Sequence, residues 1–138
     1  MPKRWSHLVA AALLMGGAVV RVQAHGPTEE TVTPRLQQPL PNVPGKTFSA
    51  ITVDFAPGVT AKPHRHGDAY VYAYVLAGTV RSQLEGEPAR DYRTGESWQE
   101  PPGAHHVLTR NVSASKPARL LVVFVSNSGD ALKVPDAE

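Results

Sequence analysis

Between residues 47 and 126, short apolar or β-branched segments alternate with turns rich in glycine and proline. No window of about 11 residues in this region has the i, i+3, i+4, i+7 apolar spacing of an amphipathic helix. Short strands about ten residues apart, with turns between them, are typical of an all-β barrel or double sheet. The pattern therefore predicts an all-β domain with strands at 51–55, 70–76, 79–84, 89–92, 98–100, 106–110 and 119–125.

The first residues of the chain have the features of a secretory signal peptide. Two basic residues precede an apolar stretch at residues 8–20, and the small residue Ala24 precedes His25. The stretch is shorter than the roughly 18 to 20 residues expected of a membrane-spanning helix. We expect cleavage between Ala24 and His25, a periplasmic or secreted protein, and no stable membrane span after cleavage. The alternative is an uncleaved N-terminal anchor.

Composition narrows the classes of function. Once residues 1–24 are removed, 11 of the 14 basic residues remain against 12 acidic ones, so the basic balance belongs to the precursor. No basic run or alternation of aromatic and basic residues is present, and we expect no nucleic-acid partner. The chain has no cysteine. Thiolate ligands, cysteine nucleophiles and disulfides are therefore excluded.

The chain divides into four parts by composition. Residues 1–24 are the predicted signal peptide, and residues 25–46 form an irregular arm with five prolines. Residues 47–126 form the single predicted barrel domain. Residues 127–138 are a C-terminal tail with little apolar periodicity. The arm is expected to be extended and to pack on the domain or on a partner subunit.

Two short patches hold four of the six histidines. His64 and His66 are two residues apart, so on a strand their side chains point to the same face. A second patch contains His105 and His106. Imidazole is the commonest protein ligand for transition metals. The pair could therefore share one ion with a third histidine from the second patch.

Both patches lie within longer motifs. Residues 58–78 have the pattern Gly-x5-His-x-His, followed after a strand by Gly, which resembles the first motif of the cupins. Residues 95–111 have the pattern Gly-x5-Pro-x-Gly-x2-His, followed by Asn, which resembles the second. The resemblance implies a cupin-type jelly-roll barrel of six to eight strands with one metal ion inside. By the same resemblance the metal ligands are His64, His66 and His106.

The sequence departs from this family at one position. Cupins usually carry a glutamate ligand separated from the second histidine by three or four residues, which corresponds here to Tyr70 or Val71. Counting back from Gly78 puts Val71 at the glutamate position. Asp68 and Glu100 are the nearby carboxylates. Gly67 is expected to interrupt the strand before Asp68, and Glu100 is expected to point away from the site. The simplest interpretation is a three-histidine site with neutral ligands.

The resemblance implies one divalent transition metal, with Fe(II) favoured and Mn, Ni, Cu or Zn as alternatives. We consider two functions, both with a small molecule as partner. The first is a metal-dependent oxidoreductase, similar to three-histidine cupin dioxygenases, that acts on a small oxygen-bearing molecule. The alternative is a non-catalytic periplasmic module that binds a small ligand or a metal. A barrel that has lost its metal is a third option.

Aromatic residues add predictions about packing. Tyr70, Tyr72 and Tyr74 share one face of a predicted strand. If the intervening residues face inward, as the resemblance implies, the tyrosines cover the outside of the barrel, and a homodimer could form there. One phenol near the metal is the alternative. Trp98 and Phe124 are expected in the core.

Two further histidines have open roles. His105 would face opposite to His106 in a strand, so we interpret it as an outward or supporting residue. His25 would become the first residue after cleavage, and a terminal amine with its imidazole can chelate copper. Nothing else in the arm supports a copper site.

Overall fold

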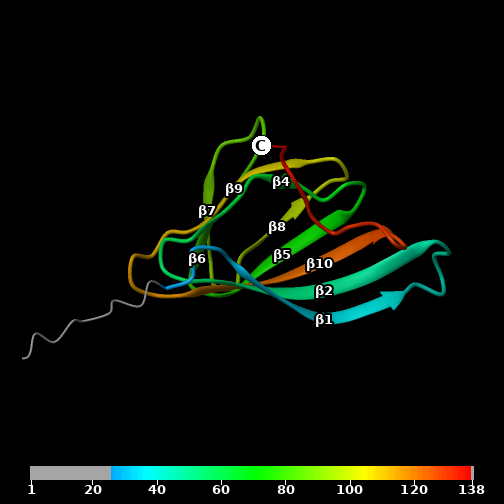
Figure 1. Ribbon diagram of the computed structural model, residues 1–138, viewed down its shortest axis with the longest axis horizontal. Coiled ribbons are helices and arrows are strands. Elements are labelled where there is room, and N and C mark those ends of the chain that lie inside the picture. The colour runs from blue at the N-terminus through cyan, green and yellow to red at the C-terminus, as the bar shows by residue number, and fades with distance from the viewer. Residues whose placement is uncertain (1–25, 138) are drawn as a thin grey trace, which may run out of the picture.

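A computed structural model describes residues 26–137. The predicted signal peptide and His25 lie outside this range. The described chain is all-β, and its strands form two antiparallel sheets (Figure 1). Within residues 26–137 no helix is long and apolar enough to span a membrane.

The first sheet has five strands. In spatial order these are β1 (Thr31–Pro39), β2 (Lys46–Phe55), β10 (Ala118–Asn127), β5 (Tyr70–Ala77) and β8 (Ser97–Glu100). The two long strands β2 and β10 pair along their whole length. This sheet forms the broad curved wall in Figure 1.

The second sheet is built from shorter strands. Its order is β11 (Val134–Pro135), β4 (His64–Arg65), β9 (His105–Asn111), β6 (Thr79–Leu84) and β7 (Arg90–Arg93), and β3 (Thr60–Ala61) also pairs with β9. Buried side chains from both sheets form one hydrophobic cluster. The all-β jelly-roll prediction is confirmed, and every predicted strand segment overlaps an observed strand. The short strands β3, β4 and β11 were not predicted, and neither was β1, because residues 25–46 were expected to form an irregular arm.

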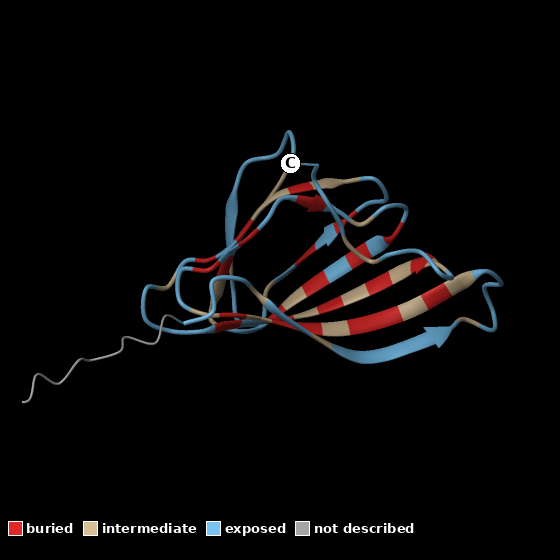
Figure 2. Ribbon diagram, viewed as in Figure 1, coloured by how far each residue is buried: buried red, intermediate tan, exposed pale blue. Residues whose placement is uncertain are grey.

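Strand alternation explains which side chains enter the core (Figure 2). On β5, Val71, Ala73 and Val75 are at most 1% exposed, whereas Tyr70 and Tyr72 are more than 40% exposed. Successive side chains of a strand point to opposite faces, so the apolar residues fill the barrel. The tyrosines lie outside, as predicted, and the homodimer stays a prediction. Trp98 and Phe124 are buried, also as predicted.

The proline-rich arm packs on the barrel through β1. This strand lies at the edge of the first sheet and pairs only with β2, with a register shift between Pro34 and Leu36. Proline lacks an N–H donor and is therefore confined to edge strands or irregular positions. The arm thus adds an edge strand to the sheet.

Gly78 and Asn111, the last residues of the two motifs, have structural roles. Gly78 links β5 to β6 with a φ of +78°, and a Cβ there would lie 2.8 Å from the Pro117 carbonyl oxygen. Only glycine fits both constraints. Asn111 is fully buried, and its amide donates to the carbonyls of Phe55, Ala56 and Lys116. This side chain therefore joins the end of β2 to the loop that precedes β10.

Candidate metal centre

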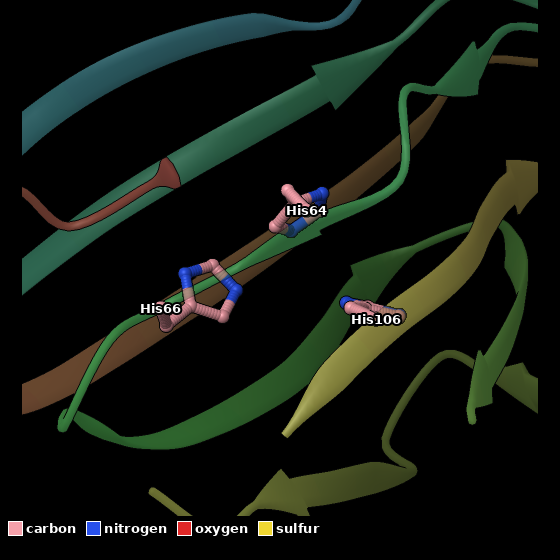
Figure 3. Close-up of side chains that lie close together, drawn as sticks. All are labelled: His64, His66 and His106. Carbon is pink, nitrogen blue, oxygen red and sulfur yellow. The ribbon is translucent and has the colours of Figure 1, made fainter. Parts of the chain in front are cut away.

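Three histidines predicted from the sequence meet inside the barrel (Figure 3). His64 and His106 are directly paired residues of β4 and β9, and His66 follows β4. One ring nitrogen from each lies within 4.8 Å of the others. The ring centroid of His64 is 4.7 Å from that of His66 and 5.2 Å from that of His106. Pairing of β4 with β9 therefore brings together side chains about 40 residues apart.

Backbone carbonyls orient the first two rings. The Nδ1 atom of His64 lies 2.7 Å from the carbonyl oxygen of Lys62, and Nδ1 of His66 lies 2.5 Å from that of Leu132. A carbonyl can only accept, so each Nδ1 carries the proton and each Nε2 keeps its lone pair. A neutral imidazole held in this way is preorganised to bind a metal through Nε2.

The third ring has different contacts. The Nε2 atom of His106 lies 2.8 Å from Ser82 Oγ and 2.9 Å from Thr109 Oγ1. Its Nδ1 atom lies 3.0 Å from Oε1 of Glu100. The two hydroxyls therefore hold Nε2, and Nδ1 is the nitrogen beside the carboxylate.

Glu100 is a neighbour of the histidines that was expected to point away from the site. It points into the barrel, is 2% exposed, and accepts a hydrogen bond of 3.0 Å from Trp98 Nε1 at Oε1. Its Oε2 has no hydrogen-bond partner and lies 3.5 Å from Nε2 of His66. Glu100 and Trp98 are two residues apart on β8 and so share a face. The prediction that Trp98 is a core residue was the signal that should have placed Glu100 inward.

The other residues considered from the sequence do not contact the three-histidine cluster through a polar side chain. Asp68 is exposed in the turn after His66, and Val71 is fully buried on β5. His105 faces away from the cluster, with Nε2 2.8 Å from Asp136 Oδ2 and Nδ1 3.5 Å from Glu85. His105 therefore contacts the surface carboxylates, as its strand parity predicted.

Burial sets the charges of the site. Desolvation lowers the pKa of His64 to about 4, and it also lowers the pKa of His66. Burial alone would raise the pKa of Glu100, but the hydrogen bond to His106 and the charges that His106 and His66 can carry lower it below its usual range. At neutral pH the site thus presents neutral imidazoles at His64 and His66 and an ionised carboxylate.

These groups line a cavity of about 240 Å³. We call His64, His66, Glu100 and His106 its polar patch. Most of the remaining wall, which we call the apolar lining, consists of Val32, Pro34, Ile51, Val53, Phe55, Ala61, Ala73, Trp98, Leu120, Val122, Phe124 and Leu132. Thr109 and an ion pair between Glu30 and Lys133 complete the wall. Nothing in the sequence indicated that pair, because its partners are 103 residues apart.

The donors suit a divalent metal ion. Imidazole nitrogens are ligands for Fe, Cu, Ni and Zn, and a carboxylate oxygen adds a hard, charged donor. The unpartnered Oε2 of Glu100 is a buried acceptor of the kind that a cation satisfies. The three-histidine cluster is thus a candidate site for one divalent metal, and its geometry does not select which one.

Comparisons with known proteins agree with this architecture. An oxalate oxidase in complex with the substrate analogue glycolate is 29% identical, with a TM-score of 0.60, over 79% of this chain and 56% of its own. A protein from Thermus thermophilus is 30% identical, with a TM-score of 0.59, over 75% of this chain and 90% of its own. The DMSP lyase DddQ from Ruegeria pomeroyi is 28% identical, with a TM-score of 0.57, over 66% of this chain and 45% of its own. No curated protein sequence matches the chain.

The chain spans little more than half the length of the oxalate oxidase that it resembles. A family model described as a cupin domain matches residues 51–124. This match covers more than half of the chain and includes both histidine patches and Glu100. The chain therefore belongs to the cupin family.

Proposed function

We propose that the protein binds one divalent transition metal, preferably Fe(II), through His64, His66 and His106, and acts as an oxidoreductase on a small oxygen-bearing molecule. The observation that carries the proposal is the convergence of three imidazoles on the wall of a cavity, two of them with Nε2 freed by backbone hydrogen bonds. When bound, such a metal supplies Lewis acidity and one-electron redox chemistry to a molecule in the cavity.

The cavity wall supports a substrate with an apolar body and one polar end. Beyond the polar patch, the polar side chains of the wall among residues 26–137 are Thr109 and the paired Glu30 and Lys133. An apolar body is favoured by contact with the apolar lining, and one oxygen-bearing head would lie at the polar patch. Two histidines kept neutral by burial leave few groups to move protons, so redox chemistry suits the site better than hydrolysis does.

The test is metal analysis of the purified protein. We expect about one metal ion per chain in the wild type and less than a tenth of this in H64A and H106A, because each variant loses a ligand. R65A is the matched control, since Arg65 lies between the two first-motif histidines but is exposed. Equal metal content in the wild type and both histidine variants would overturn the proposal.

A second function, binding without turnover, is favoured by the apolar lining and the scarcity of acid–base groups. Oxygen consumption by the Fe(II)-loaded protein separates the two functions. The panel contains diketones, phenols and thiols, with oxalate and glycolate as compounds that lack an apolar body. Uptake with an apolar compound supports the enzyme, and binding of such a compound without uptake supports the binding module.

We also propose that the protein is exported. The basis is the sequence of residues 1–24, with its basic start, apolar stretch and small residue before His25. Cell fractionation followed by N-terminal sequencing tests this. We expect the periplasmic or secreted form to begin at His25, and a full-length membrane-bound form would indicate the uncleaved anchor instead.

A further inference from the structure

Glu100 is a buried charge whose contacts within the protein are incomplete. Its Oε1 accepts from Trp98 and lies beside His106, but its Oε2 has no hydrogen-bond partner. A buried carboxylate oxygen without a partner is costly, because it has given up its hydrogen bonds to water. A group that residues 26–137 do not supply would therefore stabilise it.

The His66 nitrogen that lies across from this oxygen is also an acceptor. Oε2 lies 3.5 Å from Nε2 of His66, and the Nδ1 of that ring already donates to Leu132. Nε2 of the neutral ring consequently carries a lone pair that faces the lone pairs of the carboxylate. Two such acceptors repel each other in a low-dielectric interior unless a cation lies between them.

The distances agree with shared coordination of one ion. Two donors each about 2.1 Å from a metal are about 3.0 Å apart at a right angle and about 3.4 Å apart at the tetrahedral angle. Oε2 of Glu100 lies 3.5 Å from Nε2 of His66, and no hydrogen bond joins these two atoms. This separation therefore matches two neighbouring ligand atoms of one metal.

The strand register places Glu100 beside Val71, which occupies the position of the glutamate ligand in other cupins. Glu100 on β8 is the direct antiparallel partner of Val71 on β5, the residue that occupies the glutamate position in the sequence. Side chains of directly paired residues lie on the same face of a sheet, with Cβ atoms about 5 Å apart. Both side chains are buried on the inner face. A glutamate at either position could thus reach the same cluster.

We propose that Glu100 is a metal ligand, so that the carboxylate of the site comes from β8 across the sheet from β5. This inference rests on the proposed function, because it requires the histidines to bind a metal. A role limited to orienting His106 would use Oε1 alone. It would leave the orientation of Oε2 toward His66 without a physical reason.

The test is metal affinity, measured by titrating chelator-treated protein with Zn(II) and by the absorption spectrum of the Co(II) form. Loss of a supporting residue typically weakens metal binding 10–100-fold, so loss of a ligand should exceed about 100-fold. We expect this loss in E100V and in the nearly isosteric E100Q. We also expect both variants to change the Co(II) spectrum.

The decisive variant exchanges the two side chains. V71E/E100V has the same composition and nearly the same core volume as the wild type, but carries the carboxylate on β5. We expect it to recover affinity to within about tenfold of the wild type, because the carboxylate again faces the cluster. Q99A, which changes the exposed residue between Trp98 and Glu100 on β8 and keeps the carboxylate and its hydrogen bond, is the matched control and should stay within about tenfold of the wild type.

Two outcomes overturn the inference in different ways. If E100Q folds and binds Zn(II) within about 100-fold of the wild type, with an unchanged Co(II) spectrum, Glu100 only positions His106 and the proposed metal site survives. If the wild type binds neither ion, the proposed function fails and the inference fails with it.

Discussion

The two kinds of wall in the cavity are built in different ways. The polar patch comes from β4, β8 and β9 and from the residue after β4. Apart from Oε2 of Glu100, its polar atoms contact the backbone, hydroxyls or the Trp98 indole. The apolar lining comes mostly from β1, β2 and β10, where alternate residues of long paired strands face inward. The polar patch depends on individual hydrogen bonds, whereas the apolar lining depends on the alternation of side chains along the strands.

This difference predicts separate consequences for mutation. Apolar burial is non-directional and scales with the area removed from water, so the apolar lining should mainly determine stability and the shape of the ligand. Hydrogen-bonded donors are directional, so the polar patch should mainly determine metal binding. Variants at points where the two parts touch test whether these two roles are separate.

The largest expected effect is at Phe124, whose ring centroid lies 5.2 Å from that of His66. Phe124 is 2% exposed, and its replacement by alanine should lower the free energy of unfolding by about 3–5 kcal/mol through lost burial and a cavity. Urea unfolding measures this. V123A, next in the strand but half-buried on the other face, is the control and should lose less than about 1.5 kcal/mol.

Metal binding by the same variant tests the separation itself. The metal-loaded F124A protein should keep its affinity to within about tenfold, because the Leu132 carbonyl still orients His66. A loss as large as that expected for H64A would show that packing against Phe124, rather than hydrogen bonding, positions the ligands.

Lowering the pH should have a smaller effect on the free energy of unfolding. In the metal-free protein the pKa of His64 falls from 6.5 to about 4, so between these pH values the unfolded state binds a proton that the native state does not. Stability therefore rises with pH across this window and decreases as the pH is lowered, by on the order of 3 kcal/mol in full. The lowered pKa values of His66 and Glu100 act in the same direction.

Urea unfolding of metal-free protein at pH 7, 5.5 and 4.5 measures this dependence. H64Q removes one titrating group and should reduce the slope, whereas R65A should leave it unchanged. The assignment to His64 would be wrong if H64Q and the wild type lost the same free energy between pH 7 and 4.5.

Sequence patterns predicted the fold and most of the site for a physical reason. The alternation in β5 and β10 and the turns between strands are local, and two spaced motifs were enough to identify three histidines that meet in space. Glu100 was missed because motif spacing follows the chain, whereas the carboxylate lies across a strand pair, opposite Val71. Its register with β5 depends on the whole sheet, although its parity with Trp98 was already present in the sequence.

The smallest expected effect is at the ion pair between Glu30 and Lys133, which joins the arm before β1 to the C-terminal segment. Glu30 is 11% exposed at its side chain and Lys133 is 36% exposed. K133M keeps the apolar stem and removes the charge, so we expect a loss of about 1 kcal/mol in urea unfolding, between the values for surface and buried pairs. Metal affinity should stay within about twofold, because the backbone carbonyl of Leu132 is retained.

The charge-exchanged variant E30K/K133E is the control for this pair. It should recover most of the lost stability if the attraction between the two charges holds the termini together over the cavity. Recovery in E30K/K133E together with faster binding of apolar compounds by K133M would mean that the terminal segments limit entry to the apolar lining. Equal losses in K133M and in the exchanged variant would instead assign the stability to packing of the lysine stem, and the two parts of the wall would then be joined by apolar contact alone.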